Sequence, residues 1–174
     1  MIILGIDPGY AIVGYGVISF NGSCYKAIEF GAIFTEPDIS LPERLEIIYN
    51  RIESIINRIK PDAISIESLY FQNNQKTAIM VAEARGVILL VAQMNKIKIF
   101  EYTPLQVKTI VTGYGKAKKP QVMDMTKRLL RLKEMPKPDD TADALAIAIC
   151  HANVCGSELK LKIISEKGKN KDVF

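Results

Sequence analysis

An Asn21-Gly22 pair between two runs of alternating residues constrains the fold of this chain more than any other sequence feature. Both residue types tolerate the positive φ angles of a two-residue hairpin turn. The flanking runs, Ile12–Phe20 and Cys24–Phe34, are therefore predicted to pair as antiparallel strands. The apolar run Ile2–Ile6, which ends at Asp7-Pro8-Gly9, supplies a strand in front of them, so the first third of the chain predicts an antiparallel meander.

After residue 40 the pattern changes to helices that alternate with strands. Ser40-Leu-Pro-Glu43 is a capping box, and the helical apolar spacing that follows it ends at Pro61-Asp62. The further predicted elements are a strand Ala63–Glu67, a helix Ala78–Met94, a strand Lys96–Tyr102, a helix opened by the capping box Thr103–Gln106, a helix from Pro120 to about Lys133, and a last helix from Asp139 or Asp140 to about Asn153. This order predicts an α/β fold, with a five-stranded mixed sheet flanked by helices.

The length of 174 residues corresponds to one domain, which we place at residues 1–156. The polar, lysine-rich remainder, 157–174, is expected to be a poorly ordered tail. The longest apolar runs have seven residues, so we expect no membrane span and no membrane partner. Cys24, Cys150 and Cys155 form no even-numbered framework and have no metal-ligand spacing, which favours reduced thiols and the cytoplasm.

Carboxylates occupy places in the pattern where apolar residues are expected. Asp7 and Glu67 each end an apolar strand, and Asp140 and Asp143 share one face of an otherwise apolar helix. An ionised carboxylate taken out of water costs several kcal/mol unless it is paired or bound to a cation. Taken singly, each could be a helix cap or a surface charge, but together they predict an oxygen-rich site for Mg²⁺ or Mn²⁺. Two such ions would support hydrolysis of a phosphodiester.

Several of these segments resemble the RuvC family of Holliday-junction resolvases. The resemblance is carried, in order, by Ile3-Leu-Gly-Ile-Asp-Pro-Gly9, Ile66-Glu67, Ala84-Arg-Gly86, Pro104-Leu-Gln-Val-Lys108 with Thr112-Gly-Tyr-Gly115, and Asp140-Thr-Ala-Asp-Ala-Leu-Ala-Ile-Ala148. It implies a ribonuclease H-like fold and a homodimer that nicks four-way DNA junctions with divalent metal. It also implies a branch-migration complex of the RuvA–RuvB type as a partner.

Carried over position by position, the resemblance implies that Asp7, Glu67, Asp140 and Asp143 are the catalytic, metal-binding residues. Asp139 is adjacent to Asp140, so the choice between the two rests on the three-residue spacing to Asp143. The implied cofactor is Mg²⁺, with Mn²⁺ as a substitute, at two ions per subunit.

Charge is distributed unevenly along the chain, and this points to a polyanion. The whole chain carries +4, but residues 108–137 carry nine basic against two acidic residues. A solvated pair of helices would give the same pattern. The candidate DNA-binding residues are Tyr70 and Phe71, which could stack on bases or anchor a loop, and the lysines around the glycine loop, Lys108, Lys116, Lys118 and Lys119.

Three further residues near these motifs are weaker functional candidates. Arg85 could contact DNA or form a structural ion pair, and Lys76 is a weaker candidate than the lysines above. His151, the only histidine, fits a core or helix-end role better than metal ligation.

The favoured function is a structure-selective endonuclease that resolves Holliday junctions by paired symmetric nicks. A ribonuclease H-like nuclease on RNA:DNA hybrids and a non-catalytic junction-binding protein are the alternatives. An actin-like kinase is disfavoured, because that fold uses two such domains and this chain accommodates one.

Overall fold

The computed structural model describes residues 1–68 and 75–169, and the side chains of residues 1–68 and 77–156. Its elements are, in order, β1 (Ile2–Asp7), β2 (Ile12–Phe20), β3 (Tyr25–Phe34), α1 (Leu41–Ile59), β4 (Ala63–Glu67), α2 (Gln75–Met94), β5 (Lys98–Tyr102), α3 (Pro104–Thr112), α4 (Lys119–Leu129) and α5 (Asp139–Lys169). The element order is the predicted one.

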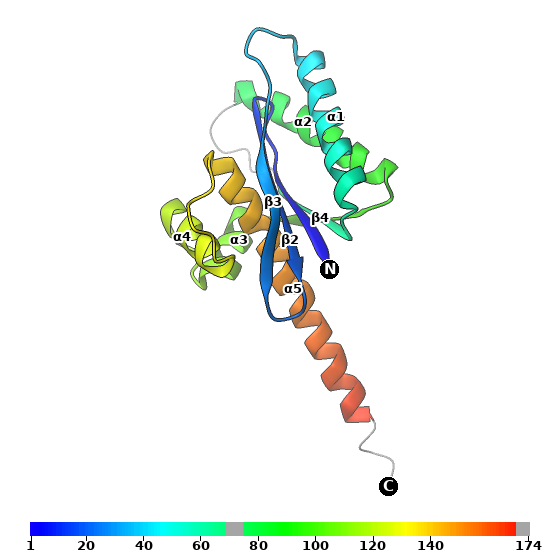
Figure 1. The fold of residues 1–174 in the computed structure, drawn as a ribbon, viewed down its shortest axis with the longest axis vertical. Coiled ribbons are helices and arrows are strands. Elements are labelled where there is room, and N and C mark those ends of the chain that lie inside the picture. The colour runs from blue at the N-terminus through cyan, green and yellow to red at the C-terminus, as the bar shows by residue number, and fades with distance from the viewer. Residues whose placement is uncertain (69–74, 170–174) are drawn as a thin grey trace.

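The largest difference in boundaries concerns α5, which we expected to end near Asn153. It continues to Lys169, and Figure 1 shows its second half projecting beyond the sheet. No proline follows Asn153 to stop the helix, and its first half is anchored by burial. The division of the chain at residue 156 stays a prediction.

All five strands form one mixed sheet in the order β3-β2-β1-β4-β5. The predicted meander is confirmed, because β1 pairs antiparallel with β2, and β2 pairs antiparallel with β3. Strands β4 and β5 extend the sheet in parallel on the other side of β1. This is the ribonuclease H-like arrangement that the family resemblance implied.

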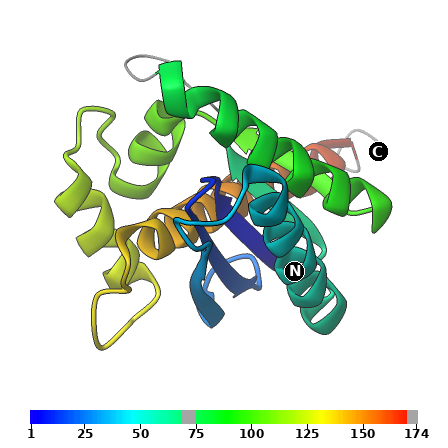
Figure 2. The same ribbon diagram turned by 90° about the horizontal axis from the view of Figure 1, so that it is seen from above.

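Helices cover both faces of the sheet, with one apolar core on each side. Figures 1 and 2 show α1 and α2 over one face, and α5 with α3 and α4 on the other. The inner side of α1 buries Ile48, Ile52, Ile55 and Ile56. The second core lies under α5, whose residues Ala144–Cys150 are all buried. The uninterrupted apolar run in this helix therefore reflects packing on several sides.

The approach of α5 to the sheet depends on strand glycines. A Cβ atom added to Gly5 would lie 2.1 Å from the carbonyl oxygen of Ala144, and one added to Gly14 would lie 2.0 Å from that of Asp140. Gly16 meets the side chain of Leu145 in the same way. Because the obstruction at Gly5 and Gly14 is backbone, these two positions fix how closely and in which register α5 lies on β1 and β2.

Helix α2 differs from α1 in its outer surface. Large apolar side chains are exposed at Ile79, Leu90 and Met94, and Gly86 between them has no atom within 4 Å of an added Cβ. By length and composition alone, the stretch Thr77–Met94 is apolar enough to cross a membrane, a test that core helices also pass. Its inner side packs into the core at Ala84 and Ile88.

His151 and Arg85, whose roles could not be decided from the sequence, both make contacts within the fold. His151 is buried, and its Nδ1 lies 2.7 Å from the hydroxyl oxygen of Tyr102, which fits the expected core role. Arg85 of α2 forms an ion pair with Glu101 of β5 at 2.6 Å, so the structural alternative holds for this side chain.

Candidate active site

Asp7 and Glu67 lie side by side where two parallel strands end. The register pairs Ile6 with Ile66, so the next residue on each strand, Asp7 and Glu67, occupies the same level of the sheet. Asp7 has the same strand parity as Gly5, so it lies on the face covered by α5. Since carboxyl ends of parallel strands meet at one edge, the sheet itself brings these two acids together.

The other two acids come from the first turns of α5. Gly14 pairs with Asp7 in the sheet and also touches the backbone of Asp140. The same glycine therefore places the start of α5 beside the end of β1. Asp143, three residues further on, lies on the same helix face as Asp140.

The ionisation of Asp7 reflects this crowding. Burial raises the pKa of Asp7 well above its usual value, and the nearby charges of Glu67, Asp143 and Asp140 raise it further. Burial also raises the pKa of Glu67, and Asp143 adds to the effect. These carboxylates therefore form one electrostatic cluster, in which each negative charge makes the next one less favourable.

Asp139 and Asp140 differ in surroundings. The negative charge of Asp140 acts on Asp7. Asp139 has a side chain that is 60% exposed, and one of its oxygens lies 3.5 Å from Lys119 Nζ. The geometry thus supports Asp140 as the member of the acidic cluster, in line with the three-residue spacing.

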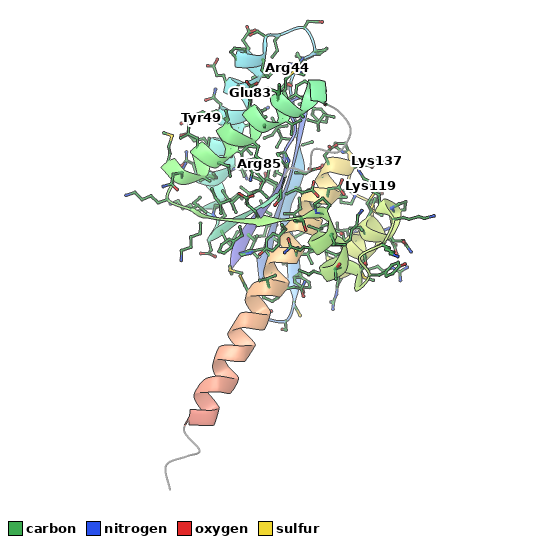
Figure 3. The ribbon with its side chains drawn as sticks, turned by 180° about the vertical axis from the view of Figure 1, so that it is seen from behind. Arg44, Tyr49, Glu83, Arg85, Lys119 and Lys137 are labelled. Atoms are coloured by element: carbon green, nitrogen blue, oxygen red, sulfur yellow. The ribbon has the colours of Figure 1, made fainter. Side chains whose placement is uncertain are left out.

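Lys119, the first residue of α4, is the cation in contact with this cluster. Its Nζ lies 2.9 Å from an oxygen of Asp143. Burial raises the pKa of Asp143, and the hydrogen bond from Lys119 opposes that rise. Figure 3 shows Lys119 near the beginning of α5, where Asp139 and Asp143 lie.

The carboxylates do not form a preassembled ligand set. Among the residues whose side chains are described, no three of the His, Cys, Asp and Glu side chains are grouped so that they could hold a metal ion as they stand. Mutual repulsion and the ion pair of Asp143 with Lys119 both act against such a grouping. The donor chemistry nonetheless fits a hard divalent cation, because the cluster offers carboxylate oxygens and buried negative charge.

A pocket of about 300 Å³ opens beside the cluster. Its lining combines the acids Glu67 and Asp143, the lysines Lys108 and Lys119, and the apolar side chains of Pro104, Val107, Val122 and Ile147. The wall of this pocket comes from four elements, β4, α3, α4 and α5. The pocket therefore juxtaposes carboxylates with ammonium groups, of which that of Lys119 is the more exposed member of its pair with Asp143; we call it the lysine-rimmed pocket.

The candidate DNA-binding residues fall into three groups. Lys108 and Lys119 line the pocket, and the charge of Lys108 lowers the pKa of Glu67. Lys116 and Lys118 are exposed on the loop before α4 and are not part of the pocket wall. Tyr70 and Phe71 lie outside the described residues, as does the side chain of Lys76.

Gly14 is the site residue that sequence reasoning missed. It bears no functional group, so motif analysis passed over it, although it sets the position of Asp140. The signal was present as the Gly14-Tyr-Gly16 alternation, because glycines spaced by two on a strand mark one face that another backbone approaches closely.

The strand order, together with an acidic cluster at the carboxyl ends of β1 and β4, defines a ribonuclease H-like protein. Comparison with known sequences identifies the family. The family model described as "Crossover junction endodeoxyribonuclease RuvC" matches residues 3–151. The chain belongs to this RuvC family.

Individual relatives match over almost the full length. The crossover junction endodeoxyribonuclease RuvC of Fusobacterium nucleatum is 49% identical over 178 residues, covering 98% of this chain and 94% of the relative. The protein of the same name from Clostridioides difficile is 52% identical over 167 residues, covering 96% and 99%. Among solved structures, Thermus thermophilus RuvC in complex with Holliday junction substrate is 33% identical, with a TM-score of 0.87 over 91% of this chain and 96% of that one.

Proposed function

We propose that this protein resolves Holliday junctions as a metal-dependent endonuclease that makes paired, symmetric nicks in DNA. The observation that carries the proposal is the cluster of Asp7, Glu67, Asp140 and Asp143 beside a lysine-rimmed pocket, within a RuvC-family fold. The related T. thermophilus protein was solved with a Holliday junction as its substrate, which supports the same ligand here.

Asp7, Glu67, Asp140 and Asp143 are the residues that would hold the divalent cations, Mg²⁺ or Mn²⁺, at two per subunit. When bound, such ions activate a water and stabilise the leaving oxygen of the phosphodiester. The ammonium groups of Lys108 and Lys119 lie where they can bind the phosphates of the strand and oppose its charge. The carboxylates of the pocket repel a phosphate when no cation is bound. Lys108 and Lys119 therefore supply the attraction that holds the strand at the pocket.

A homodimer fits both the substrate and the surface of the protein. A four-way junction has near two-fold symmetry, so two equivalent sites can cut opposed strands. The outer stripe of α2, made of Ile79, Glu83, Gly86, Leu90 and Met94, is mostly apolar and has room at Gly86 for another helix to approach. We propose this stripe as the dimer contact.

The dimer contact predicts that Leu90→Arg yields monomers, because it places a charge in a buried apolar contact. Molar mass measured by light scattering on a sizing column should fall by half, while the circular dichroism spectrum is unchanged. Phe34→Arg, at an exposed residue of β3, is the matched control and should leave the mass unaltered. A dimeric Leu90→Arg protein would exclude this surface.

The remaining parts of the proposal concern cellular context. A branch-migration complex of the RuvA–RuvB type would deliver the junction, and the cytoplasm is the proposed compartment. Cys24 and Cys150 are free thiols, which supports a reducing environment.

The test of the function offers the purified protein a synthetic four-way junction, a linear duplex and an RNA:DNA hybrid with Mg²⁺. The expected result is nicking of the junction alone, at symmetric positions on two opposed strands. Asp7→Asn should lower the nicking rate at least 10³-fold, while junction binding survives, because the change removes a cluster carboxylate. Cleavage of the hybrid with an intact junction would select the ribonuclease alternative, and tight binding without nicks would select the non-catalytic one.

A further inference from the structure

An exposed aromatic residue lies on the loop between α3 and α4, the two helices that contribute Lys108 and Lys119 to the pocket. Tyr114 is 57% exposed, and Leu105 in the first turn of α3 is 62% exposed. Gly115, the residue after Tyr114, lies against α3, because a Cβ added to it would lie 2.8 Å from Leu105 Cδ1 and 2.9 Å from Thr109 Oγ1. The loop thus folds back on α3 and leaves two large side chains in solvent at one place.

Hydrogen bonds hold the backbone of this loop. The hydroxyl oxygen of Thr112 lies 2.7 Å from the carbonyl oxygen of Lys108, to which it donates, and it accepts a bond from the amide of Tyr114 at 3.1 Å. The amide of the buried Ala117 donates to the Tyr114 carbonyl at 3.0 Å. Gly113 supplies the left-handed turn, at φ 75°, that starts the loop. The ring is therefore presented from a fixed backbone, which reduces the entropy cost of a contact.

The charge around Tyr114 has a single sign along the chain. Residues 103–123 contain four lysines and no Asp or Glu. Two of the lysines, Lys108 and Lys119, line the pocket, and Lys116 is exposed two residues after Tyr114. Scattered exposed apolar residues are normal, but an aromatic ring in a segment whose charged residues are all basic is typical of surfaces that bind nucleic-acid strands, since the cations hold phosphates and the ring stacks on bases.

We propose that Tyr114 contacts DNA, with its ring stacked on an exposed base at the exchange point, near the phosphates held by Lys108 and Lys119. This inference rests on the proposed function, because it takes junction DNA as the ligand. Where the strands exchange, the terminal base pair of an arm loses its stacking neighbour when the arms spread apart, so a base face there is open to an aromatic ring. The contact differs from those expected of Tyr70 and Phe71, because it arises from α3 and its loop, whereas those residues follow β4.

The experiment measures the Kd of the full-length protein for a four-way junction in EDTA, so that no strand is cut, over a series of salt concentrations. The junction carries 2-aminopurine at the exchange point, whose fluorescence reports stacking. Tyr114→Ala should weaken binding about tenfold and abolish the change in fluorescence, whereas Tyr114→Phe should stay within about twofold of wild type. The slope of log Kd against log salt should not change for Tyr114→Ala, but it should fall by about one for Lys116→Ala.

The matched control is Phe34→Ala, because Phe34 is 59% exposed and lies on β3, at the opposite edge of the sheet from the strand that leads into α3. It should bind like wild type, and equal melting temperatures would show that both variants fold. Wild-type affinity of Tyr114→Ala, or an equal loss in Phe34→Ala or Tyr114→Phe, would overturn the inference. If the wild-type protein does not bind the junction, the proposed function and this inference are both wrong. If it binds and nicks the junction but Tyr114→Ala keeps wild-type affinity, only this inference is wrong.

Discussion

The acidic and basic halves of the site are built by different means. Asp7 and Glu67 end adjacent sheet strands, and Asp140 is set by backbone contact with Gly14. The lysines stand on α3, α4 and the loop between them; Lys116, Lys118 and Lys119 are exposed, and Lys108 is half-buried. The backbone positions of the acidic half are therefore set by the sheet and by the packing of α5, whereas the basic half stands on surface elements.

This difference follows from what each half has to do. Like charges repel, so carboxylates stay together only if the surrounding structure fixes them. Ammonium groups that bind a flexible polyanion need no such fixation, because each gains from any nearby phosphate. Rigidity is thus concentrated where the electrostatic cost is highest.

The largest effect is expected from Gly14→Ala. The added methyl group would lie 2.0 Å from the carbonyl oxygen of Asp140, so α5 has to move away from the sheet. We expect a loss of about 3 kcal/mol in the free energy of unfolding, measured by urea denaturation, together with loss of nicking. Gly31→Ala is the matched control, because its methyl group meets only the side chain of Tyr15, at 3.0 Å or more. Equal losses in both variants would show that the acidic half is not held by this contact.

Most of the fold could be predicted from the sequence, because its signals are local. The capping boxes at Ser40 and Thr103 each start a helix through contacts within a few residues, and the Asn-Gly pair correctly predicted a turn between β2 and β3. The two-residue form of that turn was wrong: the loop spans residues 21–24 and only Gly22 has a positive φ, because the Asn21 side chain accepts hydrogen bonds from the amides of Ser23 and Cys24. The extent of α5 could not be predicted in this way, because a long helix is stabilised by burial of its first half rather than by a local stop signal.

The residues of the site show the same distinction between local signals, which the sequence contains, and long-range contacts, which it does not. The apolar surroundings of Asp7 and Glu67 revealed them as unusual, and their strand-end positions predicted that they meet. The pairing of Lys119 with Asp143 and Asp139 depends on how α4 packs against α5, which is a long-range contact without a sequence pattern. The close contact of Gly14 with α5 is likewise a tertiary feature.

A smaller effect, of opposite sign, is expected from Asp7→Asn in EDTA. Burial and the neighbouring carboxylates raise the pKa of Asp7, so its ionised form is less favourable in the folded than in the unfolded protein. Removing that charge should stabilise the protein at pH 7 by about 1 kcal/mol, or about 2–4 °C in melting temperature. Added Mg²⁺ should raise the melting temperature of wild type more than that of Asp7→Asn, because the ion binds the folded carboxylates. A destabilised Asp7→Asn protein would contradict the account of the acidic half.

The contribution of Asp7 to the free energy of unfolding depends on pH, and its sign follows from the raised pKa of this residue. Below the ordinary Asp pKa of 3.8 the side chain is protonated in both states, so Asp7→Asn and wild type should differ little there. As pH rises through the higher pKa of the folded protein, wild type loses stability relative to the variant, because its folded state must give up a proton it holds more tightly.

Lys119→Met provides the counterpart in the basic half, since it removes the cation that pairs with Asp143. Because Lys119 is half exposed, we expect a destabilisation of only a few tenths of a kcal/mol. A loss as large as that of Gly14→Ala would mean that the basic half is as much a part of the rigid frame as the acidic one.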